Sequence, residues 1–124
     1  MYTFTKEERL CNKRLIDSLF HNGSSFLCYP FKVSWLLSEE IPAPVQVLFA
    51  APKKRFKHAT DRNTIKRRIR EAYRQNKQEQ LYNLLGDKKL ILALTYVGKE
   101  IESTELIHKR MVKTLAQLTA ELAK

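Results

Sequence analysis

The sequence predicts an α+β fold, a single-domain two-layer sandwich over residues 1–124 with a mixed four-stranded sheet and the element order α-β-β-β-α-β-α. Three observations support this fold class. The chain has 124 residues, 44% of them hydrophobic and 29% charged, which suits one globular domain with a modest core. Segments with strand-like patterns are interspersed with segments of helical periodicity. The chain contains no repeat, linker or low-complexity tract.

A first helix is predicted from Asn12 to His21. Gly23 follows it and is expected to act as a left-handed C-terminal stop. Nearer the N-terminus, Thr5 and Glu8 have the spacing of a capping box. The helix prediction rests on apolar side chains at helical spacing, which are Leu15, Ile16, Leu19 and Phe20.

Four strands are predicted. Residues 31–37, FKVSWLL, alternate as a half-buried strand does. The apolar segments 45–51 and 89–97 predict two buried strands, the second of them central, and a short strand is predicted over residues 26–29. In the alternating strand one side would carry Phe31, Val33, Trp35 and Leu37, and the other Lys32, Ser34 and Leu36.

Two further helices complete the fold. The first has Thr60 or Asp61 as its expected N-cap and ends near Gln78. The second begins after Ser103, its expected cap. Its apolar stripe comprises Leu106, Ile107, Met111, Val112, Leu115, Leu118 and Leu122.

The positive charge of the chain is concentrated in one segment. The formal net charge is +10, and the segment from Lys53 to Arg74 holds ten basic and two acidic residues, a local charge of +8. The other 102 residues hold 13 basic and 11 acidic residues. This balance favours a nucleic acid or an anionic membrane as partner. A membrane is the less expected of the two partners, because the helix that follows Thr60 needs its apolar stripe for the core.

The basic helix is predicted to have two opposite faces. At about 100° per residue, Ile65, Ile69 and Ala72 fall with Tyr73 on one arc, which would face the core. Like charges at helical spacing repel by a few tenths of a kcal/mol each, and arginine suits bidentate phosphate contacts. The opposite arc, expected to bind a polyanion, carries Asn63, Lys66, Arg67, Arg70 and Arg74.

Other residues extend this surface. Arg62 and Arg68 fall on the flanks of the core stripe, where their stems can lie along apolar neighbours while the charged heads reach the solvent. A helix N-terminus also attracts phosphate. The segment PKKRFKHA before the helix adds Lys53, Lys54, Arg55 and Lys57.

Several functional classes find no support in the residues. The chain has no apolar run of about 18 residues and no secretory signal pattern, so we expect a cytoplasmic protein without membrane contact. Cys11 and Cys28 lack metal-site spacing and are expected to be reduced thiols. No catalytic residue and no metal ligand is predicted, because the carboxylates and histidines (His21, His58 and His108) are scattered.

The stretch DRNTIKRRIREAYR, residues 61–74, resembles the protein component of bacterial ribonuclease P. Arg62 and Asn63 match the first two positions of the family's Arg-Asn-Arg motif, and Thr64 stands at the third. PKKRF resembles the family's preceding basic stretch, with Lys57 where a glycine is frequent. Residues 6–26 are similar to its first helix and turn, and the resemblance spans about residues 5–97. The residues that match after the motif are Lys66, Arg67, Ile69, Arg70, Glu71 and Ala72.

The resemblance implies a fold like that of domain 2 of ribosomal protein S5, with a left-handed βαβ crossover. It also implies a protein subunit that binds the ribonuclease P RNA and precursor tRNA as a monomer in a 1:1 complex with the RNA. The RNA would hydrolyse the 5′ leader with Mg²⁺, and the protein would position the substrate. The residues implied for the catalytic RNA are Lys53, Lys54, Arg55, Lys57, Arg62, Asn63, Lys66, Arg67, Arg68, Arg70 and Arg74.

The resemblance further implies a cleft for the single-stranded leader, between the first helix and the sheet. Aromatic stacking there is worth roughly 1–3 kcal/mol per base. Ile16 occupies a position where the family frequently has an aromatic residue, and each aromatic candidate has burial in the core as its alternative. The candidates for this cleft are Lys13, Ile16, Phe20, Tyr29, Phe31, Lys32 and Trp35.

Two other readings stay open from the residues. A ribosomal or other structural RNA-binding protein would have the same charge distribution, but it leaves the motif and the leading helix without a joint explanation. A DNA-binding helix would need several base-reading side chains among its exposed arginines, and only Asn63 qualifies.

Overall fold

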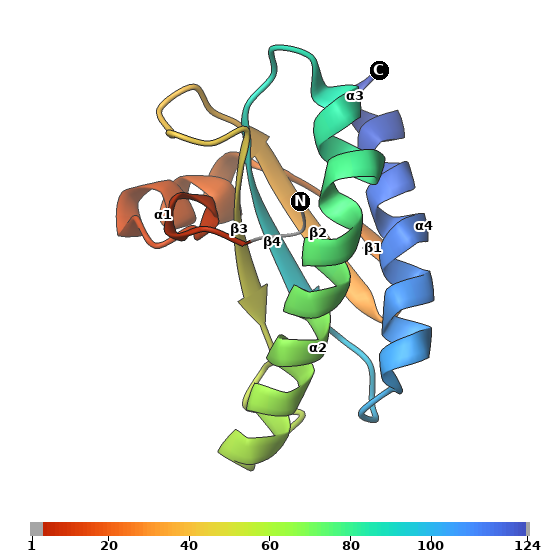
Figure 1. Cartoon of the computed structure of the whole chain (residues 1–124). Helices are drawn as coiled ribbons and strands as arrows, with labels where there is room; N and C mark the ends of the chain where they lie inside the picture. Colours follow the sequence, from red (N-terminus) through yellow and green to blue (C-terminus); the bar gives the residue numbers. More distant parts are fainter. Residues whose placement is uncertain (1–3, 124) are drawn as a thin grey trace.

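Two long helices cover one face of a four-stranded sheet, and a shorter helix lies against the other face (Figure 1). The computed structural model describes residues 4–123. The elements in chain order are η1 (Lys6–Glu8), α1 (Lys13–Asn22), β1 (Ser24–Cys28), β2 (Phe31–Leu37), β3 (Val45–Ala50), α2 (Ala59–Lys77), η2 (Gln78–Tyr82), α3 (Asn83–Leu85), β4 (Leu90–Tyr96) and α4 (Thr104–Leu122).

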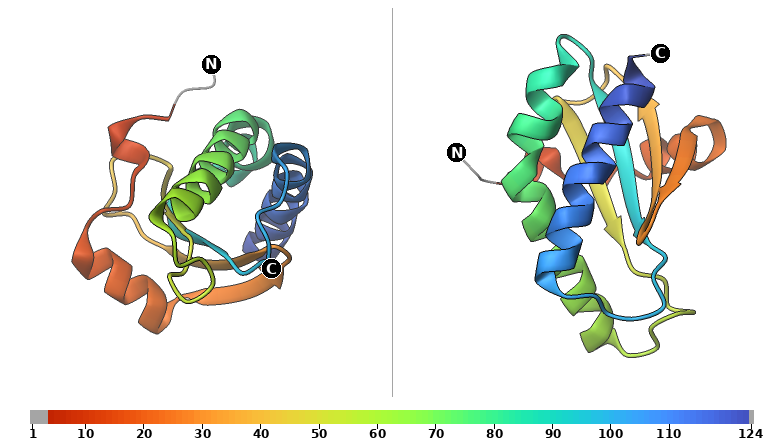
Figure 2. Two further views of the ribbon diagram at one scale, coloured as in Figure 1. Left: turned by 90° about the horizontal axis from the view of Figure 1, so that it is seen from below. Right: turned by 90° about the vertical axis from the view of Figure 1, so that its right-hand side faces the viewer.

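The sheet is mixed, as predicted, with the strand order β1-β2-β4-β3. Strands β1 and β2 are antiparallel, as are β2 and β4, whereas β3 and β4 are parallel. In the right-hand view of Figure 2 the long helices face the viewer, β3 and β4 run downward, and β4 lies to the right of β3. A chain that passes from β3 through the helix in front to β4 in this way makes a left-handed crossover, against the general rule for βαβ units.

The larger core lies between the sheet and helices α2 and α4. Strand β4 alternates between the two faces: Leu92 and Leu94 belong to this core, and Ile91 and Ala93 to a smaller one under α1. Helix α2 contributes Ile65, Ile69, Ala72 and Tyr73, and α4 contributes Ile107, Met111, Leu115, Leu118 and Leu122. All of these are buried, which confirms the predicted stripe on α2.

A buried ion pair joins the N-terminal segment to the end of α2. The Glu8 carboxylate accepts hydrogen bonds from the Lys77 ammonium and, at 3.0 Å, from the Tyr82 hydroxyl. The same carboxylate lies 3.3 Å from the Thr5 hydroxyl, so the predicted Thr5–Glu8 pairing is confirmed. Lys77 also lies over the Phe4 and Tyr82 rings, at 5.6 and 5.4 Å from their centroids.

The predicted helix ends are partly wrong. Gly23 has φ −76°, an extended conformation and not a left-handed one. A Cβ there would lie 2.4 Å from the Leu19 carbonyl oxygen and 2.8 Å from that of Trp35. Glycine is therefore needed at this position for a close backbone approach.

The basic helix begins earlier than predicted, whereas its predicted end near Gln78 is confirmed, because α2 ends at Lys77 with Gln78 as its C-cap. Its N-cap is His58, so Thr60 and Asp61 lie inside the helix. At the other end the helical path continues through the π-helical turn η2 and α3 to Gly86, whose φ is +63°. No glycine or proline interrupts the chain between Lys77 and Gly86, which explains why the helical path extends past Gln78. Ser103 does cap α4, because its hydroxyl accepts a bond from the Leu106 amide at 3.1 Å.

Candidate RNA-binding surface

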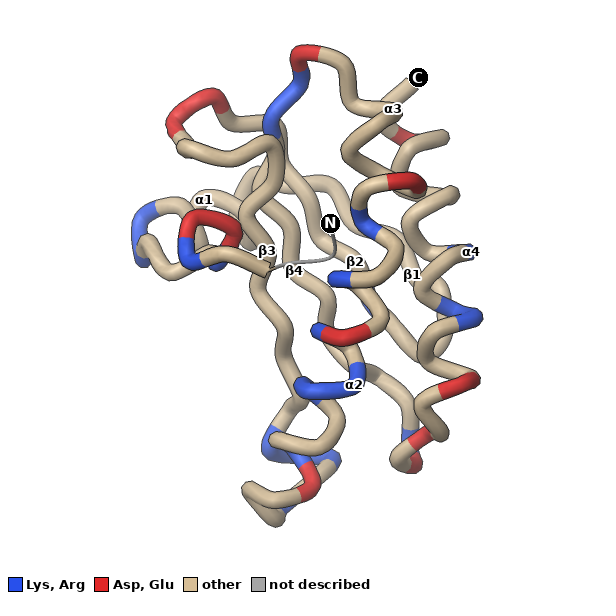
Figure 3. Tube along the Cα trace, in the orientation of Figure 1, with Lys and Arg blue, Asp and Glu red and all other residues tan. Residues whose placement is uncertain are grey.

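Helix α2 exposes a row of cations on the side opposite its core stripe. Asn63, Lys66, Arg67 and Arg70 are exposed, and together with Thr64 they surround an open depression of about 470 Å³. In Figure 3 the basic residues gather along α2 and the loop that leads into it. An open, positive surface of this kind suits the phosphates of a nucleic acid.

Arg74, also predicted for this row, is engaged within the helix. Its guanidinium donates a hydrogen bond to the Glu71 carboxylate at 2.7 Å. This bond is the main cause that lowers the pKa of Glu71. Burial opposes it, and the charges of Arg74, Arg70 and Arg67 lower the pKa further. Glu71 therefore remains ionised and neutralises part of the charge at this end of the row.

The basic loop before α2 is held by one buried aromatic ring. Phe56 packs 5.8 Å from the Tyr96 ring, centroid to centroid, and is buried. The amides of Arg55 and Phe56 both donate to the Pro52 carbonyl, which closes the turn. The loop side chains that remain exposed around this anchor are Lys53, Lys54, Arg55 and Lys57.

Arg62 and Arg68 differ from the prediction that their charged heads reach the solvent. The Arg62 guanidinium donates to the carbonyls of Phe56 and Lys57, at 2.7 and 2.9 Å, and so ties the basic loop to α2. The Arg68 guanidinium donates to the Glu102 carbonyl at 2.7 Å, in the loop before α4. Both side chains are half-buried, and each binds carbonyl oxygens of a loop that packs beside α2. The sequence pattern does not reveal these contacts.

We use the term basic face for the exposed polar residues of α2 and its loop. Thr64, at the third position of the motif, is half-buried beside these residues and donates its hydroxyl to the Thr60 carbonyl at 3.0 Å. The basic face comprises Lys53, Lys54, Arg55, Lys57, Asn63, Lys66, Arg67 and Arg70.

A second surface lies on the opposite side of the sheet, beside α1. On one flank of this helix, Arg14 and Ser18 line a pocket with Leu37, at the C-terminal end of β2. At about 100° per residue, the predicted cleft residues Lys13, Ile16 and Phe20 lie on the other flank. That flank faces the opposite end of the strands.

The face of the sheet that carries α1 is uncovered at that end. The residue pairs Leu27–Lys32, Lys32–Thr95 and Thr95–Ala50 form one row across all four strands, on the α1 side. These four residues, which we call the open row, are exposed or half-buried. Figure 1 shows β3 and β4 extending past α1 toward the start of α2. Tyr29, exposed in the turn between β1 and β2, lies at the same end.

Two residues predicted for the cleft point to the other side of the sheet. Phe31 is fully buried in the core beneath α2 and α4, and Trp35 packs against that core. The prediction is wrong for these two because adjacent strand residues face opposite sides, so Lys32 and Phe31 cannot share one cleft. Lys32 is exposed in the open row.

Arg9 was not predicted as part of either surface. Its side chain is exposed and lines a groove together with Lys66 and Arg70, although it lies more than 50 positions earlier in the sequence. The bridge between Arg9 and Val47 brings the N-terminal segment beside β3. A single arginine in the segment KEER carries no signal of this pairing.

Residues 4–123 contain neither a cluster of metal-binding side chains nor a membrane-spanning helix. No group of three or more His, Cys, Asp or Glu side chains in this range is arranged to hold a metal ion. No helix in the described part of the chain is long and apolar enough to cross a membrane.

Comparison with known proteins gives consistent matches. The family model described as ribonuclease P matches residues 4–119. The ribonuclease P protein component of Porphyromonas gingivalis is 32% identical over 98% of this chain and 90% of its own length. That of Chlorobium phaeobacteroides is 38% identical over 89% of this chain and 84% of its own length.

Solved structures agree in fold. The RNase P protein of Thermotoga maritima superposes with a TM-score of 0.70 at 22% identity, covering 89% of this chain and 96% of that one. The Staphylococcus aureus protein superposes with a TM-score of 0.66 at 22% identity, covering 94% and 95%.

Proposed function

Because this chain belongs to the family of bacterial ribonuclease P protein components, we propose that it binds the catalytic RNA through its basic face and the 5′ leader of precursor tRNA beside its open row. Family membership gives it a role in tRNA processing, as part of a ribonucleoprotein endoribonuclease, and ribonuclease P RNA as its partner. The ribosomal-type alternative is not favoured by these matches.

The observation that carries the proposal is the basic face itself. Its cations are exposed on one side of a helix whose other side is buried, and Arg62 holds the basic loop against that helix. Each cation that neutralises a phosphate releases a counterion, so binding should weaken steeply with salt. The duplex regions of a folded RNA offer phosphates at a spacing that such a surface can follow.

The leader is proposed to lie beside the open row, flanked by α1. Phe20 is 55% exposed and Tyr29 is 51% exposed, so both rings are available to stack on bases. Lys13 and Lys32 would neutralise leader phosphates. Leu27 adds exposed apolar surface in the same row. Phe31 and Trp35 are not part of this proposal.

The proposal includes a division of labour between the RNA and the protein. Hydrolysis is assigned to the RNA, which would bind the required Mg²⁺, and no metal ligand is placed on this chain. The protein would act by holding precursor tRNA near the RNA and by screening the repulsion between them. We propose a 1:1 complex of protein and RNA.

Reconstitution tests the proposal. A bacterial ribonuclease P RNA at low magnesium is incubated with precursor tRNA, with and without this chain, and leader removal is measured. We expect strong stimulation by the chain and a large loss of it in the double variant Arg67→Ala, Arg70→Ala. The matched control is Lys109→Ala with Lys113→Ala, exposed lysines on α4 outside the basic face. Absence of stimulation by the unaltered chain would refute the proposal.

A further inference from the structure

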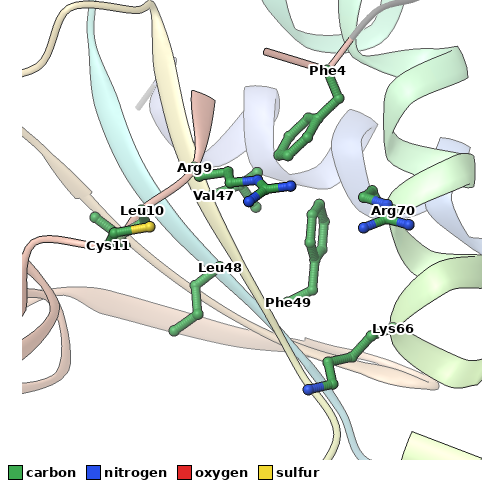
Figure 4. Close-up of a pocket in the computed structure, with 9 residues that line it drawn as sticks. All are labelled: Phe4, Arg9, Leu10, Cys11, Val47, Leu48, Phe49, Lys66 and Arg70. Carbon is green, nitrogen blue, oxygen red and sulfur yellow. The ribbon is translucent and has the colours of Figure 1, made fainter. Parts of the chain in front are cut away.

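A groove lies between the N-terminal segment, β3 and α2, at the edge of the basic face (Figure 4). Its volume is about 340 Å³, near the lower end of the range of roughly 300–1,000 Å³ for small-ligand sites. Figure 4 shows the side chains of Arg9, Phe49 and Arg70 turned toward one space. The groove is lined by Phe4, Arg9, Leu10, Cys11, Val47, Leu48, Phe49, Lys66 and Arg70.

The lining divides into an apolar floor and a cationic rim. Val47 and Phe49 of β3 face α2 and form the floor, whereas Leu48 lies on the opposite face of the strand at the edge of the groove. The rim carries exposed arginines and a lysine on two sides. None of the described residues that line the groove is acidic. A ligand that matches it must therefore combine a flat apolar part with negative charge, and an RNA nucleotide has both.

The aromatic part of the groove is held in a fixed orientation. The Phe49 ring lies 5.6 Å from the Phe4 ring and 5.7 Å from the Tyr73 ring, centroid to centroid. Tyr73 is fully buried, whereas Phe4 and Phe49 are only partly buried. A ring fixed in this way can stack on a base without first losing rotamer freedom.

We propose that this groove binds one unpaired nucleotide of the RNA that occupies the basic face. The base would stack on Phe49, and its flanking phosphates would contact Arg9 on one side and Lys66 and Arg70 on the other. A paired base cannot enter, because it is stacked inside its helix. The inference rests on the proposed function and specifies which feature of the RNA the surface selects.

Hairpin binding tests the groove directly. The probe is a short RNA hairpin with one bulged adenosine, compared with the same hairpin fully paired, at equal salt. We expect the full chain to bind the bulged hairpin at least about fivefold more tightly, the lower limit for stacking one base. Phe49→Leu should remove this preference, Arg9→Gln should reduce it, and Lys109→Gln on α4 should leave it unchanged.

Each outcome of the hairpin experiment is decisive. Equal affinity of the unaltered chain for both hairpins overturns the groove proposal, and so does a preference that neither Phe49→Leu nor Arg9→Gln reduces. Arg9 is exposed, so a failure to fold does not obscure the result for that variant. Stimulation of leader removal is measured on the same preparations. If stimulation is present without a bulge preference, only the groove proposal fails; without stimulation, the proposed function fails.

Cys11 provides an independent readout. Its thiol lines the groove and is exposed, whereas Cys28 at the end of β1 is half-buried and outside the groove. The bulged hairpin should slow alkylation of Cys11 by iodoacetamide several-fold and leave the rate at Cys28 unchanged. An unchanged rate at Cys11 under saturating hairpin contradicts occupancy of the groove.

Discussion

Phe20 and Phe31 have the same side chain in opposite environments. Phe20 is 55% exposed on α1, whereas Phe31 is fully buried under α2 and α4. We expect Phe31→Ala to lower the free energy of unfolding by about 3–5 kcal/mol, because it leaves a cavity in the core. Phe20→Ala should change it by less than about 1 kcal/mol. Urea denaturation measures both values.

The same pair separates stability from substrate binding. Phe20→Ala should weaken binding of precursor tRNA to the reconstituted complex by roughly five- to a hundredfold, the effect of losing one stacked base, and should leave mature tRNA nearly unaffected. Equal losses on the two tRNAs would show that Phe20 makes no leader contact.

Each exposed arginine of the basic face is expected to contact one RNA phosphate. Replacing Arg67 by Gln should weaken binding of ribonuclease P RNA and reduce the slope of log K against log salt by about 1. Lys109→Gln, with an exposed side chain on α4, is the control and should leave the slope unchanged. A salt titration with an unaltered slope for Arg67→Gln would show that Arg67 makes no phosphate contact.

At the scale of elements, the junction of α1 and β1 depends on the missing side chain of Gly23. We expect Gly23→Ala to destabilise the protein by about 1–3 kcal/mol, because its Cβ would overlap the carbonyl oxygens of Leu19 and Trp35. Gly23→Asn should do no better. At Gly86, where φ is +63° and no atom lies within 4 Å of an added Cβ, asparagine should be tolerated better than alanine. Thermal unfolding of the four variants checks this contrast.

The Glu8–Lys77 pair joins two elements that are 69 positions apart. Lys77→Met should cost about 3–5 kcal/mol, because it leaves the Glu8 carboxylate buried without its cation. Adding Glu8→Gln should recover a large part of that loss, since the amide oxygen can still accept from Tyr82. Urea denaturation of the two single variants and the double variant measures the coupling, and additive losses would contradict it.

For the molecule as a whole, buried tyrosines predict a loss of stability at alkaline pH. Burial raises the pKa values of Tyr73, Tyr82 and Tyr96 above their usual value near 10. Above about pH 10 the unfolded chain releases tyrosine protons that the folded state keeps. The tyrosines therefore do not change the free energy of unfolding below that pH, and they lower it as the pH rises further. Each tyrosine contributes at most about 1.4 kcal/mol per pH unit.

Urea denaturation at about pH 9 and about pH 11 tests this alkaline loss. Tyr82→Phe removes one of the three titrating groups, so the difference between the two pH values should be smaller in this variant than in the unaltered chain. An identical difference would show that Tyr82 does not contribute.

The sequence predicts the positions of the strands along the chain well, because strand alternation and helical periodicity are local properties of neighbouring residues. It fails where the outcome depends on contacts between distant segments. The bonds of Arg62 and Arg68 to loop carbonyls are of this kind, and so is the groove formed by Arg9 with α2. Strand parity alone would have excluded Phe31 from the cleft that contains Lys32. The angular position of α2 side chains was predictable because a helix fixes it over short distances.

The two hydrogen bonds from Arg62 to the basic loop have a thermodynamic consequence for assembly. A flexible lysine-rich loop would lose backbone entropy when RNA orders it, at roughly 1–2 kcal/mol per residue. Here folding has already ordered the loop, so association should show a small change in heat capacity and little gain in protection from proteolysis. Arg62→Ala would transfer that ordering to the binding step, and calorimetry would then record a more unfavourable entropy of association with the same phosphates.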